Sequence, residues 1–68
     1  MPPQVRPGIS VLDINEHPVG TVLRVLSATF IADIDGEHLE LDRSVVFSAD
    51  EFSLKLVCER EAVRHYLA

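Results

Sequence analysis

Three histidines are the residues of this chain best suited to hold a metal ion. A protein zinc site needs several Cys or His ligands, usually close together at short, regular spacings. His17 falls in a predicted turn, His38 on a predicted strand and His65 in a predicted helix, with no i, i+2 or i, i+4 pairing among them. We therefore predict that they are solvated polar residues, and that the chain holds no metal and no other cofactor.

The segment Asp33–Glu37, with the sequence DIDGE, resembles the start of a calcium-binding loop. A calcium loop of the EF-hand kind has about twelve residues and lies between two helices. Here the segment lies between two runs of alternating apolar and polar residues, and Asp35-Gly36 is the dipeptide typical of a two-residue type I′ hairpin. The sequence predicts a hairpin turn.

The acidic residues in and after this turn have two interpretations that the sequence leaves open. They form a docking surface for a basic partner, or they form a solvated sheet edge whose charges block aggregation with other sheets. The residues are Asp33, Asp35, Glu37, Glu40 and Asp42.

Cys58 is the only cysteine, which excludes a disulfide within the chain. A reactive thiolate needs a nearby base or cation and some exposure. The alternation instead places Cys58 on the same strand face as Phe52, Leu54 and Leu56, so we predict an inert core residue. The serines have no recognisable histidine and carboxylate context, and no glycine-rich phosphate loop is present. We expect no catalytic residues and no enzymatic activity.

Charge and composition restrict the classes of partner. Six Lys and Arg against eleven Asp and Glu give a net charge of −5, which disfavours binding to phosphate backbones and anionic lipid. No apolar run approaches the ~20 residues of a membrane span. The opening MPPQVRPG lacks the apolar stretch of a signal peptide. We expect a cytoplasmic, soluble protein that does not insert into membranes.

The candidate residues are positioned by a mainly β chain. Residues 1–8, with three prolines, are predicted to form an extended arm, and residues 9–68 a single domain. The predicted strands are Ile9–Ile14, Thr21–Leu26, Thr29–Ile34, Glu37–Asp42 and Phe52–Cys58, and Arg43–Phe47 is a short apolar segment between the last two. Gly20 is predicted to permit a bend or bulge at the start of the second strand. A short helix with Cys58 as its N-cap is predicted to follow, because the apolar residues change to helical spacing.

Two segments carry more apolar residues than one small core needs. In Thr21–Leu26, strict alternation sends Leu23 and Val25 to one face and Val22 and Leu26 to the other. Val45–Phe47 is a run of three apolar residues, which either bends inward or meets a second subunit. We predict a protein interface that comprises Val22, Leu26, Val45, Val46 and Phe47.

Two parts of the chain resemble PRC-barrel-like domains. The opening of such domains is similar to Gly8-Ile9-Ser10-Val11-Leu12 followed, after a turn, by Val19-Gly20-Thr21-Val22. Their ending is similar to Ser44-Val45-Val46-Phe47 and Phe52-Ser53-Leu54-Lys55-Leu56, which run into a short helix. The likeness covers about Val5 to Tyr66. It implies a small SH3-like barrel of five to six short antiparallel strands with a short C-terminal helix.

The resemblance also implies a kind of function. Members of this superfamily include modules of the photosynthetic reaction centre and of the ribosome maturation factor, and small free-standing prokaryotic proteins. They serve as protein-binding or assembly modules, and they supply no motif of functional residues to transfer. We expect a non-catalytic interaction module that binds another protein or itself as a homodimer.

Two alternatives belong to other classes. The first is an RNA- or ribosome-associated accessory module similar to the ribosome maturation factor barrel. It requires a local basic face, whereas the basic residues are scattered among acids. The second is a small-ligand or enzymatic role, for which the sequence offers no motif.

Overall fold

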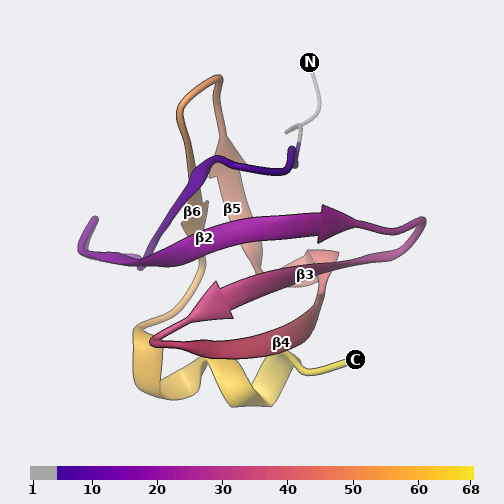
Figure 1. The fold of residues 1–68 in the computed structure, drawn as a ribbon. Coiled ribbons are helices and arrows are strands. Elements are labelled where there is room, and N and C mark those ends of the chain that lie inside the picture. Colours follow the sequence, from indigo (N-terminus) through magenta and orange to yellow (C-terminus); the bar gives the residue numbers. More distant parts are fainter. Residues whose placement is uncertain (1–4) are drawn as a thin grey trace.

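The computed structural model describes residues 5–68, which form a strongly curled sheet with a helical segment beneath it (Figure 1). Six strands and two 3-10 helices follow one another in this part of the chain. They are β1 (Ser10–Leu12), β2 (Pro18–Val25), β3 (Thr29–Ile34), β4 (Glu37–Asp42), η1 (Arg43–Val45), β5 (Val46–Ala49), β6 (Ser53–Leu56) and η2 (Arg60–Tyr66). The prediction of a mainly β chain is confirmed.

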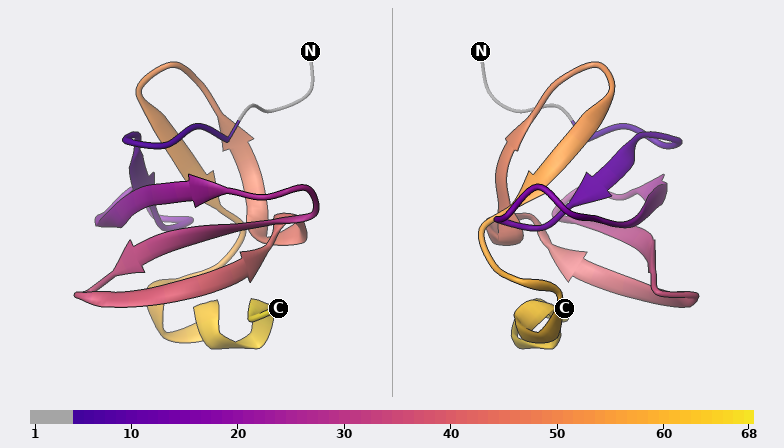
Figure 2. Two further views of the ribbon diagram at one scale, coloured as in Figure 1. Left: turned by 45° about the vertical axis from the view of Figure 1, so that its right-hand side comes forward. Right: turned by 90° about the vertical axis from the view of Figure 1, so that its left-hand side faces the viewer.

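The strands make one sheet in the order β4-β3-β2-β1-β6-β5, curled into a half-barrel. In Figure 2 the layer of β2, β3 and β4 crosses the layer of β5 and β6, and η2 lies below them. The expectation that all strands pair antiparallel is wrong, because β1 and β6 pair in parallel, with Ser10 opposite Ser53. Parallel neighbours are joined by a crossover rather than a hairpin. Apolar and polar residues alternate in the same way in parallel and in antiparallel strands, so the sequence pattern does not distinguish the two kinds of pairing.

The core fills the inside of the half-barrel. On β3, Phe30, Ala32 and Ile34 are buried, as the alternation predicts, and on β4 Leu41 is buried and Leu39 partly so. The buried hydrophobic residues are Ile9, Val11, Val19, Val22, Phe30, Ala32, Ile34, Leu41, Val45, Leu54, Leu56 and Val63. Because they come from every strand except β5 and from both helices, the described chain builds a continuous core of its own.

Two irregularities interrupt the pairing of β2. Val11 pairs with Gly20 but Leu12 pairs with Pro18, so Val19 is an extra residue beside Gly20. The predicted bend or bulge at Gly20 is thereby confirmed. Further along, Val22 pairs with Ala32 but Arg24 pairs with Ile31, so Leu23 is a second extra residue.

The extra residue at Leu23 shifts the alternation of β2 by one position. Val22 and Val25 therefore both contribute to the core, whereas Leu23 and Arg24 are both exposed. The prediction that Val22 shares a face with Leu26, and Leu23 with Val25, is wrong for this reason.

The β3–β4 hairpin forms as its sequence predicts. Asp35 and Gly36 both have positive φ, 53° and 85°, as a type I′ turn requires. The Asp33 carboxylate accepts a hydrogen bond from the Gly36 amide at 2.8 Å. The acidic start of this segment therefore stabilises a turn.

The last strand is shorter than predicted. Leu54 and Leu56 are fully buried, but Phe52 is 79% exposed and Cys58 is partly buried beyond the strand end. The prediction that Phe52 faces the core is wrong. The Asp50 carboxylate accepts hydrogen bonds from the amides of Phe52 and Ser53, at 2.8 and 2.9 Å, and thus keeps Phe52 in the turn.

The C-terminal helix is a 3-10 helix, with Glu59 rather than Cys58 as its N-cap. Val63 anchors η2 in the core. After the helix, Leu67 forms a bridge with Leu41, and the Ala68 amide donates to the Glu40 carbonyl at 3.0 Å. The end of the described chain therefore pairs with the outer edge of β4.

The predicted arm, residues 1–8, lies partly outside the described residues. Within the described part, Val5 packs against the core. Gly8 has a φ of 90° and its amide donates to the Val22 carbonyl at 2.7 Å. The chain thus turns at Gly8 before it enters β1.

Candidate interaction surface

The structure separates the five residues predicted to form an interface. Val22 and Val45 are only 1% and 0% exposed, so they belong to the core and are unavailable to a partner. The η1 turn directs Val45 inward, which is one of the two alternatives for this apolar run. Leu26 and Val46 are partly buried. Phe47 is 59% exposed and remains a surface residue.

The β5–β6 hairpin carries the two most exposed aromatic side chains of the described chain. Figure 1 shows this hairpin rising beyond the layer of β2, β3 and β4. Phe47 lies on its outer face, because the inward positions belong to Leu54 and Leu56. The Lys55 ammonium lies 5.4 Å from the centre of the Phe47 ring. Phe52 is at the tip of the hairpin.

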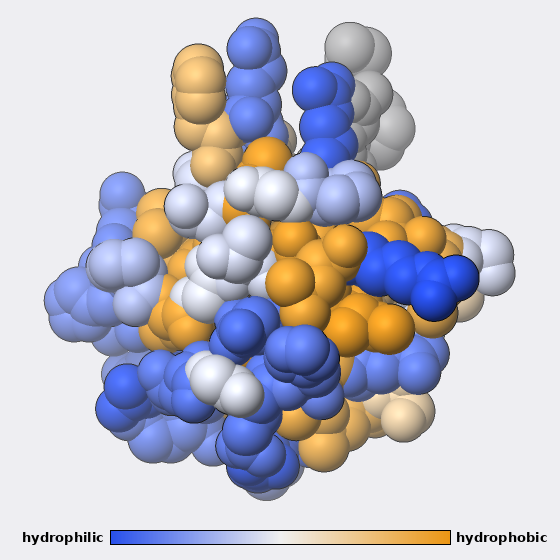
Figure 3. All heavy atoms as spheres, viewed as in Figure 1, coloured by the Kyte–Doolittle hydropathy of each residue, from blue (hydrophilic) through white to orange (hydrophobic). Residues whose placement is uncertain are grey.

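A second apolar surface covers the outer side of β2 and β3. Leu23 is 42% exposed, Arg24 beside it is exposed, and Ile31 opposite Arg24 is partly buried. Figure 3 shows hydrophobic surface over these two strands, crossed by a strongly hydrophilic side chain. The sequence predicted a contact through this strand but named Val22 and Leu26 rather than Leu23, because the bulge that turns Leu23 outward has no signal in an apolar run.

The acidic residues around the β3–β4 turn have structural contacts. Asp33 caps the turn, Glu40 accepts a hydrogen bond from the Thr29 hydroxyl at 2.7 Å, and the other three contact the helices. Asp35 pairs with Arg60, Glu37 pairs with Arg64, and Asp42 accepts from the Ser44 amide at 2.8 Å. That amide holds the pKa of Asp42 below its usual value. The run therefore stabilises the fold at its edge.

Most basic side chains have contacts within the chain. Arg60 binds Asp35, with its Nε 3.2 Å from one carboxylate oxygen, and Arg64 binds Glu37. Lys55 lies 3.7 Å from Glu16, and Arg43 donates to the Leu26 carbonyl at 2.8 Å. These pairings leave no continuous basic face on the described chain, which weighs against the RNA-associated alternative.

Arg24 differs from those side chains. Within residues 5–68, no hydrogen bond or ion pair is found for its guanidinium, although it stands beside exposed Leu23 in an acidic molecule. An exposed cation next to apolar surface is a composition typical of protein interfaces, where Arg is enriched.

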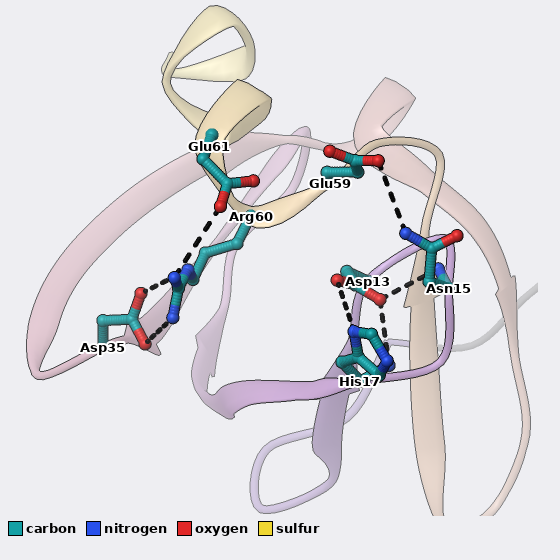
Figure 4. Close-up of polar contacts among 7 residues, drawn as sticks. All are labelled: Asp13, Asn15, His17, Asp35, Glu59, Arg60 and Glu61. Carbon is teal, nitrogen blue, oxygen red and sulfur yellow. Dashed lines mark hydrogen bonds and ion pairs between the residues drawn. The ribbon is translucent and has the colours of Figure 1, made fainter.

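A polar cluster lies between the β1–β2 turn and the start of η2 (Figure 4). Asp13 is only 5% exposed, and one carboxylate oxygen accepts from the amides of Asn15 and His17, both at 2.9 Å. The His17 Nδ1 lies 3.7 Å from the other oxygen, and its ring is exposed to solvent. Asp13 and His17 line an open cavity of about 180 Å³, and Arg60 and Glu61 line it from the side of η2. The amides of the β1–β2 turn therefore satisfy the hydrogen-bonding capacity of this Asp13 oxygen, and the carboxylate has a structural role as the cap of the turn.

The three histidines lie on different elements of the fold, and Cys58 lies near Asp13. His17 follows the β1–β2 turn, His38 lies on β4 and His65 on η2, and no group of three metal-ligating side chains occurs among the described residues. Burial raises the pKa of the Cys58 thiol, and the nearby Asp13 carboxylate raises it further. A raised pKa lowers the thiolate fraction and so opposes nucleophilic chemistry.

Comparison with protein-family models, with curated proteins and with solved structures finds no match for this chain. In the described part, no helix has the length and apolar character needed to span a membrane.

Proposed function

We propose that this protein is a non-catalytic β-barrel module for protein interaction and assembly, and that it self-associates. One observation carries the proposal: a chain with a complete core still exposes large hydrophobic side chains. They are Leu23, Phe47, Phe52 and Leu67.

The exposed side chains have an energetic consequence. Burial of a large apolar side chain contributes about 1.5–3 kcal/mol, and the fold already gains this from its own core residues. Aromatic residues are enriched in protein interfaces and in their energetic hot spots. Phe47 and Phe52, held on one projecting hairpin, are therefore suited to insertion into a pocket of a partner.

The resemblance to PRC-barrel-like domains supports the same proposal. The half-barrel with a C-terminal helical segment is compatible with an SH3-like barrel of that type. We accordingly propose a prokaryotic, cytoplasmic protein whose role is to bind proteins. The described residues offer the alternative RNA-binding role no basic face.

Sedimentation velocity of the purified chain, over concentrations up to hundreds of micromolar, tests self-association. We expect a shift from monomer to dimer at tens of micromolar, the range in which modest apolar contacts operate. A monomer at every concentration would contradict self-association.

The hairpin is tested separately by site-specific photo-crosslinking in cells of the source organism. A photoreactive phenylalanine analogue at Phe52 is expected to give discrete adducts with one protein, identified by mass spectrometry. The matched control places the analogue at Glu51, the exposed neighbour in the same turn. Equal or absent adducts at both positions would contradict a binding role of the hairpin.

A further inference from the structure

We infer that a second copy of this chain docks on the outer face of β2 and β3, with Arg24 of each copy paired to Glu40 of the other. This inference rests on the proposed self-association and adds the surface that performs it. The hairpin with Phe47 and Phe52 then stays free for another partner.

Three residues in one row define the contact. Arg24 on β2 is opposite Ile31 on β3, and Ile31 is opposite Glu40 on β4. Neighbouring strands are about 4.8 Å apart, so Arg24 and Glu40 lie about 10 Å apart with Ile31 between them. The row therefore presents a cation, an apolar centre and an anion in sequence across the sheet.

This order of charges is complementary to itself. A two-fold axis parallel to β3 that passes Ile31 places Ile31 of both copies in contact and puts Arg24 of each over Glu40 of the other. In a two-fold interface, each contact occurs twice with exchanged partners. An axis perpendicular to the strands would instead place Arg24 against Arg24. The charges thus select one orientation of the two copies.

The side chains suit such a contact. The Thr29 hydroxyl donates to the Glu40 carboxylate at 2.7 Å, which holds this carboxylate over β3. Packed sheets are about 10 Å apart, a gap that long Arg and Glu side chains bridge together. Asp33, the only charged residue of β3, lies on the same face, where its carboxylate accepts a hydrogen bond from the Gly36 amide at 2.8 Å and lies 3.9 Å from the His38 ring.

Leu23 adds apolar surface to the interface beside Ile31. The bulge places its side chain on the outer face next to Arg24, where it is 42% exposed. A stable interface buries about 800 Å² on each partner, roughly a fifth of this chain's surface of 4216 Å². Such an area requires contact across all of β2, β3 and β4. These are the strands that form one layer of the half-barrel (Figure 2).

A charge exchange tests the inference. Arg24→Glu and Glu40→Arg are each expected to raise the dimer dissociation constant at least about tenfold, because each places like charges together twice. The double variant R24E/E40R restores opposite charges and is expected to recover dimerisation to near the wild-type level. Sedimentation velocity measures all three dissociation constants, and circular dichroism checks that each variant is folded.

Lys55→Glu is the matched control, since it changes the net charge as Arg24→Glu does but lies on β6. It is expected to leave the dissociation constant within about threefold of the wild type. A wild-type dimer that Arg24→Glu affects no more than Lys55→Glu would overturn this face and leave self-association intact. Failure of the double variant to recover would overturn the Arg24–Glu40 pairing. A monomeric wild type would instead overturn the proposed self-association itself.

Discussion

Gly20 on β2 lies directly against the Asp33 carbonyl of β3: a Cβ at Gly20 would be 1.7 Å from that oxygen. The atoms that this Cβ would meet belong to the backbone of β3, so no flexible side chain is available to move aside. Strand pairing at this point requires glycine.

Gly20→Ala is therefore expected to separate β2 from β3 and to lose about 4 kcal/mol or more of unfolding free energy. A chain of this length has about 3–10 kcal/mol in total, so the variant is expected to be largely unfolded. Urea denaturation followed by circular dichroism measures the change. Thr21→Ala, at the exposed neighbouring position, is the control and stays folded. An unchanged midpoint for Gly20→Ala would show that the strands do not approach so closely.

The β5–β6 hairpin allows a paired test of burial. Leu54 is fully buried between β1 and β5, and Leu54→Ala is expected to cost about 2–5 kcal/mol. Phe52 is two residues away but 79% exposed, and Phe52→Ala is expected to stay within about 0.5 kcal/mol of the wild type. The comparison of urea midpoints decides which residue is in the core, and equal losses would place both there.

The attachment of η2 allows packing to be compared with ion pairing. Val63 is buried, so Val63→Ala is expected to cost about 2 kcal/mol. Arg64 forms an exposed ion pair with Glu37, and Arg64→Ala is expected to cost less than about 1 kcal/mol. The second loss should diminish in high salt, whereas the first should not. If Arg64→Ala lowered the unfolding free energy more than Val63→Ala does, ion pairing rather than packing would hold η2 against the sheet.

Asp50 predicts a local response to acid. Its carboxylate accepts hydrogen bonds from the Phe52 and Ser53 amides, and these hold its pKa below the usual value. A depressed pKa contributes stability that is present above the unfolded pKa of about 3.9 and lost as the pH falls through the folded pKa. The NMR titration of the Asp50 carboxyl carbon should have a midpoint below that unfolded value. A midpoint at or above it would contradict the turn geometry.

The Cys58 thiol should be slow to react. Its raised pKa, caused first by burial and then by Asp13, leaves less thiolate at pH 8 than an ordinary cysteine has. Alkylation by iodoacetamide is expected to be slower in the folded protein than in the same protein unfolded in urea. A faster reaction in the folded state would indicate an activated thiol.

Local pattern predicted the local features of this chain. The alternation of β3 and β4 and the Asp35-Gly36 turn depend on neighbouring residues, and they were predicted correctly. The parallel pairing of β1 with β6 depends on residues distant in sequence and was not. The interface prediction placed Val22 and Val45 at the surface, although both are in the core. The bulge at Leu23 and the short helical turn η1 before β5 determine which side chains face the core here. Neither feature has a signal in the apolar pattern of the sequence.

The surface residues likewise include some that the sequence predicted and some that it did not. Phe47 was predicted to be a surface residue from a run of apolar residues that exceeds what a small core accepts. Phe52 and Leu23 were missed because a capped turn and a bulge interrupt the alternation on which the prediction depended. Arg24 was counted only as one of several scattered cations. Its significance comes from having Ile31 and Glu40 in the same row.

The parallel pairing of β1 and β6 has a consequence for how the chain acquires its structure. Among the six described strands β1 comes first in the sequence, yet one of its two neighbours in the sheet is β6, which comes last. The β2–β3–β4 meander joins strands that are adjacent in sequence, so it is able to close early. Ser10 and Ser53 must meet across nearly the whole domain, and such distant contacts slow folding because loop closure comes first. The half-barrel is therefore expected to close late, with β6 docking on β1 in the rate-limiting step.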